Sequence, residues 1–590
     1  MFLLCFLITF FFSTTPVLAK SDFNVNQNIQ YQLDENGNAQ VLQEIELTNN
    51  LSQIYPTEYQ AIISSQNIEN ILATDNLGSI IQNIQQLNDQ TIINLKFNSQ
   101  NLGKNQKTNF KLHYKIPNLA TQKGNSWEIN IPENKNNLDN SVFTTSLFIP
   151  NTYGSLSFTS ISPQTIVSLN NQTEIYFKQL DNKNQKIYLI FGNYQLFDFK
   201  FKYLLENKSN QNKTFDITLP PETDNQKIKY RYIEPKPLNI KTDVDGNYLA
   251  SYQLSPSQKI DINIDGQVKI IHSNQHKSVI NFKDYLKKDT FWEIDDQNLI
   301  SIAANLSTPK DIYKYVVDSL NYKYKNIDYS FRQGALYSIN NPNDALCTEF
   351  TDLFITLSRI KGIPAREVQG YAYSNNVKIK PININTDILH AWPQYYDSKK
   401  EAWISIDPTW GKTTNGIDFF DDLDFNHFAF VFHGLSSLNP PPAGAYKNNQ
   451  NIKTVNVEFA KTELKNDQIP LKITPLSTKI YQSPTIKIEN PNLQTITQLK
   501  INIKKLGINT QVNLLPPLSS IEIPIQNHSF LNFILPLHYK INIDLEYNSN
   551  TVNLKIANPQ FWFKLIIFLG LIITLIGFGG IIFNRRKKTK

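Results

Sequence analysis

Apolar and polar residues alternate with a period of two over much of the chain, which is the pattern of half-buried β-strands. The alternation is clear at 41–47 and again at 260–264. Turn signals, such as the Asn-Gly pair at 36–37, separate the runs. We therefore expect a β-sandwich domain at 20–195 and a small β module at 196–275.

A helical pattern replaces the alternation after Asn281. Residues 297–306 and 308–322 have helical spacing, and Thr308 followed by proline is a good helix start. A third helix is expected from about 343 to Gly362, where glycine and then proline end it. Three strands are expected next, at about 365–373, 389–396 and 402–406.

The mixture of helices and strands predicts one α+β domain at 278–435. A Pro- and Asn-rich linker follows at 436–455. Period-two alternation then returns, and it predicts a membrane-proximal β-sandwich at 456–557. The chain thus reads as an α+β core flanked by β-sandwich domains.

Both ends carry apolar segments. Residues 1–19 end in small residues and resemble a cleaved signal peptide. Residues 561–583 are apolar enough for one transmembrane helix, and the basic tail 584–590 belongs on the cytoplasmic side. A buried core helix fits the second segment poorly. We expect a single-pass membrane protein whose N-terminal ectodomain lies outside the cytoplasm, at the cell surface or on the periplasmic side.

The net charge gives no support for a nucleic-acid partner. The formal net charge is +6, and five of those charges belong to the tail, which leaves +1 for the rest. These tail cations are Arg585, Arg586, Lys587, Lys588 and Lys590. A nearly neutral ectodomain lacks the positive field that binding to phosphates requires.

Cysteine usage draws attention to one residue. The chain has two cysteines, and Cys5 leaves with the predicted signal peptide, so Cys347 remains as an unpaired thiol. Cys347 lies near the start of a predicted helix, where backbone N–H groups and the helix dipole favour a thiolate. A buried, inert cysteine is the alternative.

A predicted hairpin brings two partners for that thiol together. With a two-residue or a four-residue loop near 398–400, strand parity places His390 and Asp407 on one face, directly opposite or diagonal. Asp407 can then orient the imidazole of His390, which can take the Cys347 proton. The other face is mostly apolar and suits packing.

The motifs around these residues resemble a known family. C-T-E-F-T-D-L-F, R-I-K-G-I-P-A-R-E-V-Q-G-Y, H-A-W and D-P-T are similar to the transglutaminase-like superfamily, over roughly 300–432. The resemblance implies a papain-like Cys-His-Asp core. It also implies Cys347 as nucleophile, His390 as general base and acid, and Asp407 as the orienting residue.

Some positions depart from the family pattern. Ala345 stands where glycine is frequent, and Gln394 replaces a frequent glutamate. Pro393 interrupts a strand, so we expect an edge position or a bulge there. Trp392 is expected to pack beside the imidazole, and Arg366 is expected to be a structural ion-pair residue.

The sequence leaves the second oxyanion donor open. The Cys347 backbone N–H is one natural candidate, and the other is a side chain from 324–341. Gln333, Tyr337 and Asn340 are the candidates there, and their spacing does not select one.

We expect no metal and no cofactor. The acids Asp418, Asp421, Asp422 and Asp424 lack an EF-hand spacing, so a solvated loop with aromatic anchors is preferred over a calcium site. A zinc site of Cys347, His390 and Asp407 is disfavoured, because the order matches an attacking thiol better. His427 and His433 are interpreted as structural.

Three functions are compatible with these residues. A thiol enzyme acting on amide bonds through an acyl-enzyme is preferred, as a cysteine protease or amidase on peptide, protein or cell-envelope substrates. The alternatives are a cross-linking transglutaminase and a non-catalytic surface scaffold or binding protein. The sequence does not identify the substrate.

Overall fold

A computed structural model describes most of the chain, and it divides into two compact units, Met1–Gly192 and Asn193–Lys590. The described residues are 22–133, 142–180, 186–272, 281–324, 332–377, 379–382, 387, 389–414, 417–420, 423–447, 452–465, 469–476, 485–503, 508–524, 538–545, 550–557, 566–567 and 569–577. The predicted signal peptide and basic tail lie outside them.

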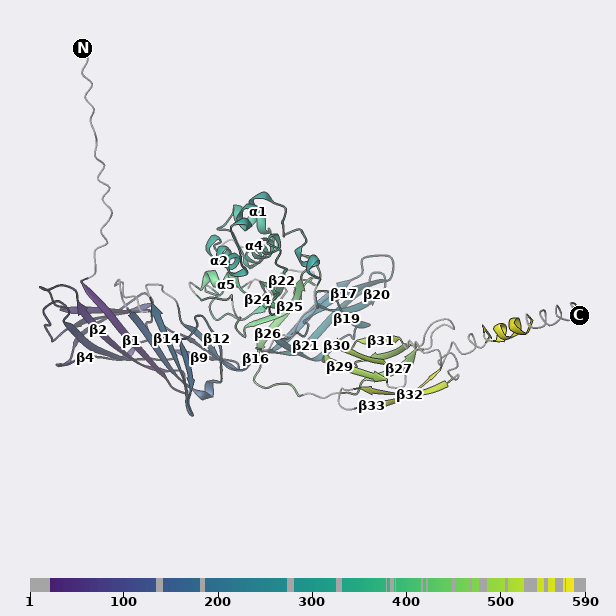
Figure 1. Ribbon diagram of the computed structural model, residues 1–590, viewed down its shortest axis with the longest axis horizontal. Helices are drawn as coiled ribbons and strands as arrows, with labels where there is room; N and C mark the ends of the chain where they lie inside the picture. The colour runs from purple at the N-terminus through teal and green to yellow at the C-terminus, as the bar shows by residue number, and fades with distance from the viewer. Residues whose placement is uncertain are drawn as a thin grey trace, which may run out of the picture. The chain divides into compact units, whose positions relative to one another are not determined.

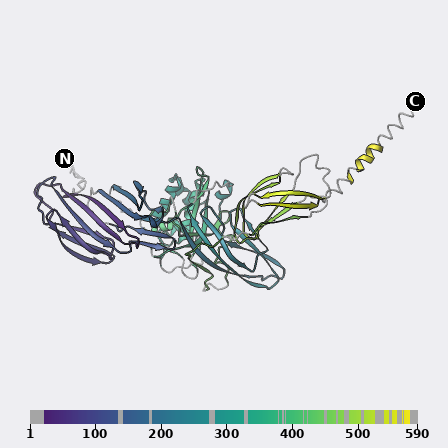
Figure 2. The same cartoon turned by 90° about the horizontal axis from the view of Figure 1, so that it is seen from below.

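The first unit is built from β-strands (purple to blue in Figure 1). Its elements are β1 Phe23–Leu33, β2 Ala39–Asn49, β3 Glu58–Ile63, β4 Glu69–Asp75, β5 Gly78–Ser79, β6 Ile81–Leu87, β7 Gln90–Lys96, β8 Lys107–Ile116, β9 Ala120–Lys123, β10 Ser126–Asn130, β11 Val142–Pro150, η1 Asn151–Tyr153, β12 Leu156–Thr159, β13 Thr165–Ser168, β14 Gln172–Leu180 and β15 Tyr188–Phe191. The strands lie side by side in Figure 2 as long ribbons. They form an eight-stranded sheet in the order β13-β14-β11-β1-β2-β8-β4-β5, together with sheets β12-β15-β10-β9 and β3-β7-β6.

One hydrophobic core joins the three sheets of this unit. Alternate residues of β1 and β2, among them Ile29 and Val41, point into it with residues of the other two sheets. The core also holds a polar row: Gln27 Nε2 donates to Gln43 Oε1 at 2.8 Å, and Gln43 Nε2 donates to the Tyr114 hydroxyl at 2.6 Å. These bonds offset part of the cost of burying the amides, although Gln27 Oε1 has no hydrogen-bond partner among the described residues.

The second unit begins with the small β module. Its strands are β16 Tyr194–Glu206, β17 Lys213–Leu219, β18 Gln226–Glu234, β19 Asn239–Thr242, β20 Tyr248–Leu254 and β21 Lys259–Ile271. They form the sheets β18-β21-β16-β26 and β17-β20-β19. The strand β26, Val455–Phe459, comes from far along the chain and pairs antiparallel with β16. The chain therefore returns to this module after the α+β domain.

The α+β domain packs helices on a four-stranded sheet. Its elements are η2 Phe282–Leu286, α1 Gln297–Ala304, α2 Pro309–Ser319, α3 Ala335–Asn340, α4 Cys347–Ile360, β22 Ala365–Ala372, β23 His390–Asp397, β24 Ala402–Ser405, α5 Pro408–Thr413 and β25 His427–His433. The sheet order is β24-β23-β22-β25. Helices α1, α2, α4 and α5 gather on one side of it in Figure 1.

Local sequence explains where these helices begin and end. Thr308 caps α2, since its hydroxyl accepts from Asp311 N at 3.1 Å while the Asp311 carboxylate accepts from Thr308 N at 2.9 Å. At the other end of the helix bundle, Gly362 adopts a positive φ of 74° just after α4. The predicted starts and stops of α1 and α2 are confirmed to within a few residues.

Two buried amides fasten the small β module to the edge strand of the four-stranded sheet, β25. Gln226 donates to Ala429 O and accepts from Ala429 N, both at 3.0 Å. Asn247 likewise donates to Phe432 O at 2.8 Å and accepts from Phe432 N at 2.7 Å. These bonds satisfy backbone groups on β25, the edge strand, which would otherwise be open to pairing with another strand.

The last part of the chain is again β. Its strands are β27 Lys472–Leu476, β28 Thr485–Glu489, β29 Ile496–Ile503, β30 Ile508–Leu515, β31 Ser520–Pro524, β32 His538–Leu545 and β33 Asn550–Ala557. They form sheets β27-β28-β31 and β30-β29-β32-β33, the first of which shares a core with β29 and β30. The chain as a whole is mostly β with a small helical core, as the alternation predicts.

Among the described residues, no helix has both the length and the hydrophobicity to cross a membrane. Of the predicted span 561–583, only 566–567 and 569–577 are described, and they are helical. The transmembrane prediction therefore rests on the sequence alone.

Candidate active site

Helix α4 places Cys347 at its first residue. The sequence had suggested a helix start three or four residues earlier, but Asp344 lies in the preceding turn, where its N donates to Asn341 O. Cys347 is a free, partly exposed cysteine. At this position its backbone N–H has no partner within the helix, and it points along the positive end of the helix dipole.

A buried glutamate fixes the start of α4. Glu349 is 2% exposed. One carboxylate oxygen accepts from Leu346 N at 3.0 Å, and the other accepts from Gln333 N at 3.0 Å. Glu349 therefore ties the segment before α3 to the turn that carries Cys347.

Strands β23 and β24 bring His390 and Asp407 together. The register pairs Gln394 with Ser405, which corresponds to the four-residue loop. Asp407 lies just past the end of β24, diagonal to His390 and on the same face. His390 Nε2 lies 2.9 Å from Asp407 Oδ2, and both side chains are buried.

Aromatic rings and a helix start hold these two groups. The imidazole of His390 stacks between Trp392, at 5.9 Å between centroids, and Trp410, at 5.2 Å. Asp407 Oδ1 accepts from Trp410 N at 3.0 Å, so Asp407 is also the N-cap of α5. The predicted position of Trp392 beside the imidazole is confirmed.

Electrostatics keeps the pair charged. Burial by itself lowers the His390 pKa, but the Asp407 carboxylate raises it, and the net result is a pKa of about 9. Burial likewise opposes ionisation of Asp407, yet the His390 charge holds the pKa of Asp407 well below its usual range. At neutral pH the pair is an imidazolium facing a carboxylate.

The Cys347 thiol is the remaining neighbour of His390. Its proximity raises the His390 pKa, in the same direction as Asp407 does. Because Nε2 faces Asp407, the other ring nitrogen, Nδ1, is the one left for the thiol. Nδ1 is buried, and it has no hydrogen-bond partner among the described residues.

A second histidine contacts the same oxygen of Asp407 as His390 does, although the sequence had suggested only a structural role for it. His427, the first residue of β25, has its Nε2 3.4 Å from Asp407 Oδ2 and its Nδ1 2.9 Å from Asp424 Oδ1. Asp424 is 3% exposed and accepts from Lys380 Nζ at 3.0 Å. The signal in the sequence was the Asp-x-x-His spacing inside an apolar run.

The acidic run therefore differs in part from the solvated loop that the sequence suggested. Phe419, Phe420 and Phe425 are buried as anchors, as predicted. Asp424, however, turns inward to His427 and Lys380 instead of facing solvent. Asp418 pairs with Lys310. Asp421 and Asp422 lie outside the described residues.

The structure separates the candidates for the second oxyanion donor. The Tyr337 hydroxyl donates to Asp344 Oδ2 at 2.7 Å, so it is already engaged. Gln333 is exposed, and its backbone is tied to Glu349 in the first turn of α4, which keeps it near Cys347. Asn340 is exposed at the end of α3.

Pro393 does not lie at an edge or a bulge. Strand β23 is an interior strand, paired with β22 on one side and β24 on the other, without a register shift. Pro393 O accepts from Ile406 N at 3.1 Å where the β24 ladder ends, so only one ladder donor is lost. The expectation drawn from its missing N–H was wrong because the neighbouring strand stops there.

Arg366 is structural, as predicted, but its partners are not carboxylates. Its guanidinium stacks on the rings of Trp403 and Phe432, and it donates to Gln394 Oε1 at 2.8 Å and to Asp245 O at 2.9 Å. Burial lowers its pKa to about 10.

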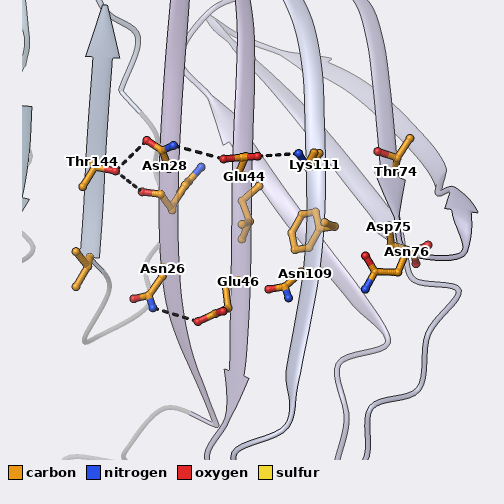
Figure 3. Close-up of a pocket in the computed structure, with 14 residues that line it drawn as sticks. Asn26, Asn28, Glu44, Glu46, Thr74, Asp75, Asn76, Asn109, Lys111 and Thr144 are labelled. Carbon is orange, nitrogen blue, oxygen red and sulfur yellow. Dashed lines mark hydrogen bonds and ion pairs between the residues drawn. The ribbon is translucent and has the colours of Figure 1, made fainter. Parts of the chain in front are cut away.

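Two cavities in the described part of the protein are not lined by Cys347 or His390. One of about 910 Å³ in the second unit is lined by Trp392, Trp403, His427 and others. Another of about 530 Å³ lies on the eight-stranded sheet of the first unit, where Figure 3 shows Asn28, Glu44 and neighbouring polar side chains bonded across adjacent strands. Because these groups pair with one another, this surface is a solvated sheet face.

Donor atoms of His390, Asp407 and His427 lie within 4.8 Å of one another, a spacing that could hold a metal ion. Cys347 is not in this group, so the zinc set weighed from the sequence differs from it. The atoms already bond to one another in pairs, and both histidines carry pKa values raised by the shared carboxylate.

Residues 300–408 match the transglutaminase-like superfamily, and they include Cys347, His390 and Asp407. This part of the chain is therefore a transglutaminase-like domain. No curated protein matches the sequence.

Solved structures are distantly similar. A "putative cysteine protease" from Cytophaga hutchinsonii is 17% identical, with a TM-score of 0.27, over 46% of this chain and 99% of its own. The periplasmic domain of TgpA from Pseudomonas aeruginosa is 13% identical, with a TM-score of 0.22, over 38% of this chain and 91% of its own.

Proposed function

We propose that the protein is a thiol enzyme that acts on amide bonds, with Cys347 as nucleophile, His390 as general acid and base, and Asp407 as the residue that orients His390. The observation that carries the proposal is the buried His390–Asp407 pair at 2.9 Å beside the thiol at the start of α4. A structural cysteine would not need a charged, buried histidine as its neighbour.

These three residues allow a reaction in two steps, acylation and deacylation of Cys347. The Cys347 sulfur attacks the amide carbonyl carbon, and the His390 imidazolium gives its proton to the leaving nitrogen as the C–N bond breaks. This leaves a thioester and a neutral His390. His390 then takes a proton from the second nucleophile, which attacks the thioester and releases the acyl product and the Cys347 thiolate.

The second nucleophile decides between two reactions. With water the enzyme is a cysteine protease or amidase; with a primary amine it is a cross-linking transglutaminase. We favour hydrolysis of peptide, protein or cell-envelope substrates, because the sequence shows no amine-binding feature. Incorporation of a labelled amine into protein would reverse this preference.

The oxyanion that forms during attack needs two donors. The Cys347 backbone N–H is one, since it is free at the first position of α4. Gln333 is the second donor that we favour, because Glu349 holds its backbone close to the same helix start.

Alkylation of Cys347 tests the proposal without knowledge of the substrate. The purified full-length chain is treated with iodoacetamide at pH 7, and labelling of Cys347 is followed by mass spectrometry. We expect a rate at least tenfold above that of a free cysteine peptide, and loss of that excess in His390→Ala. A wild-type rate equal to that of the peptide would refute the activated nucleophile and favour a scaffold.

The site is proposed to act outside the cytoplasm on an ectodomain anchored by residues 561–583. The motivation is the apolar run followed by basic residues. Deleting 561–590 is expected to move the protein from the membrane fraction to the soluble fraction. An unchanged distribution would contradict the anchor.

A further inference from the structure

We propose that His427, held by Asp424, is a positioning residue for the reaction: it keeps Asp407 ionised and fixed so that Asp407 can hold the His390 imidazolium. The inference rests on the proposed function of the Cys347 site. It adds a residue that lies outside the attacking triad and beside it.

The geometry puts two imidazoles against one oxygen of Asp407, and their ring centroids lie 5.8 Å apart. Asp407 Oδ2 lies 2.9 Å from His390 Nε2 and 3.4 Å from His427 Nε2, while Oδ1 accepts from Trp410 N. Asp407 is fully buried. A carboxylate out of water stays ionised only if donors surround it, and His427 is one of three that the structure provides.

His427 is itself held from behind. Its Nδ1 lies 2.9 Å from Asp424 Oδ1, which fixes the ring and leaves Nε2 to face Asp407. Asp424 also accepts from Asn426 N at 3.1 Å and from Lys380 Nζ at 3.0 Å. The Lys380 ammonium lies 4.8 Å from the centre of the Trp410 ring, which also stacks on His390.

Charges therefore alternate through the interior, from His390 to Asp407, His427, Asp424 and Lys380. Burial opposes the charge on His427, but its bonds to Asp407 and Asp424 raise its pKa. Apolar side chains would fill this space at a lower cost in desolvation than a buried histidine, carboxylate and ammonium. The presence of this set directly beside Asp407 is explained if it keeps that carboxylate charged and in place.

Two substitutions separate positioning from packing. His427→Phe keeps the ring volume and removes the donor, whereas His427→Gln restores an N–H near the position of Nε2. The matched control is His433→Phe in the same strand: His433 is also buried and lies 2.8 Å from a carboxylate, Glu367, but it does not contact Asp407.

The readout is the rate of Cys347 alkylation by iodoacetamide in the full-length chain. We expect His427→Phe to lower it about 10- to 100-fold, since misplacing a group in the reacting set has effects of that size. His427→Gln should recover most of the rate. His433→Phe should lower the melting temperature and leave the alkylation rate within about twofold of wild type, as a substitution outside a site does.

A double-mutant cycle with Asp407→Asn tests whether His427 acts through Asp407. If His427 acts through Asp407, His427→Phe has no further effect in the Asp407→Asn background. Additive losses, or a His427→Phe rate equal to wild type, would overturn the inference. So would one metal ion per chain, measured by elemental analysis and lost in His427→Phe, because His427 would then be a ligand.

A wild-type thiol that reacts no faster than a peptide would instead refute the proposed function. In that case the His390 titration, followed by NMR of ¹⁵N-histidine-labelled protein, decides the inference. We expect His427→Phe to shift the pH midpoint of the His390 titration in the otherwise wild-type protein. In the Asp407→Asn protein the same substitution should leave that midpoint unchanged. An unmoved titration would overturn the inference.

Discussion

At the scale of single residues, opposing effects on one imidazole set the chemistry of the site. Burial of His390 favours its neutral form, and Asp407 favours the charged form. The carboxylate prevails, which gives a pKa of about 9. In the proposed reaction this imidazolium is the acid that protonates the leaving amine at neutral pH. The activity should therefore depend on the imidazolium, and it should fall as pH rises through about 9.

Asp407→Asn tests whether the Asp407 charge outweighs burial in setting the His390 pKa. Asparagine can still cap α5, so the fold should persist. Without the negative charge, burial dominates, and the His390 pKa moves down toward or below its ordinary 6.5. We expect the alkaline limb of the pH–rate profile to move to lower pH by the same amount, and the rate at pH 7 to fall about 10²- to 10⁴-fold.

The measurements are the titration of His390, followed by NMR of ¹⁵N-histidine-labelled protein, and the rate of Cys347 alkylation at pH 7. The pH–rate profile between pH 5 and 10 is taken from hydrolysis once a substrate is found, because alkylation has no leaving amine to protonate. Asp318→Asn, at an exposed position of α2, is the matched control and should leave the profile unchanged. An alkaline limb that stays near 9 in Asp407→Asn would contradict the role given to this carboxylate.

Strand parity was sufficient to predict that His390 and Asp407 share a face, because side chains alternate on a strand whatever the loop length. The same reasoning could not find His427. It reaches Asp407 from β25, a strand on the other side of β22, and no local spacing links 407 to 427. The apolar run at 427–433 predicts a buried strand, not its place in the sheet.

At the scale of secondary-structure elements, buried polar side chains hold the four-stranded sheet of the transglutaminase-like domain in place. The edge strand β25 has its backbone groups satisfied by Gln226 and Asn247 instead of by another strand. On the other side of the sheet, Arg332 donates to Asp352 and to Glu367, and so links the segment before α3 to α4 and β22.

Gln226→Met tests the clamp on the edge strand. Methionine has a similar volume but cannot bond Ala429, so a buried N–H and a buried C=O lose their partners. We expect the free energy of unfolding to fall by about 2–6 kcal/mol, at about 1–3 kcal/mol for each of the two unsatisfied groups. Chemical denaturation measures it, and Gln253→Met, at an exposed position of β20, should cost under about 0.5 kcal/mol.

Arg332→Met tests the buried ionic cluster. It leaves the carboxylates of Asp352 and Glu367, both fully buried, without their cation, at a cost of about 3–5 kcal/mol. Burial already raises the pKa of Asp352 to about 7 with Arg332 present. Without the cation the pKa of Asp352 rises further and that of Glu367, which Arg332 holds at about 2, also rises above the unfolded values near 4. The penalty is therefore smallest at about pH 4 and grows as pH rises.

Denaturation of Arg332→Met and wild type at pH 5 and pH 8 measures this trend. The control is Arg231→Met, since Arg231 pairs with Asp198 and Asp265 in a site that is one-third exposed. Its penalty should be small at both values of pH. If Arg332→Met lowered the free energy of unfolding equally at pH 5 and pH 8, the guanidinium would not be offsetting the buried charge of Asp352 and Glu367.

Elements with strong local signals were predictable, and short ones were not. The capping residues of α2 and the glycine after α4 are read directly from the sequence. Helices α3 and α5 have six residues each, too few to show a period, and they exist because neighbouring contacts stabilise them. Cys347 became the first residue of α4 because Glu349, at the third position, bonds Leu346 N.

At the scale of the whole molecule, the chain has two units, each with its own core. The core of the first unit draws only on residues before Gly192, and the core around α4 draws only on residues of the second. Stability should therefore be divided between separate cooperative transitions and should not be a property of the chain as one body.

Calorimetry of the full-length chain with two reporter substitutions tests this division. Gln226→Met should lower the melting temperature of one transition and leave the other within about 1 °C. Gln43→Met, which breaks the buried row of Gln27, Gln43 and Tyr114, should do the converse. Each loss is about 2 kcal/mol or more, which corresponds to a shift of several degrees for a unit of this size. If both substitutions moved one common transition, the units would fold as a single cooperative body, and loss of packing in the first unit would then be expected to reduce the reactivity of Cys347.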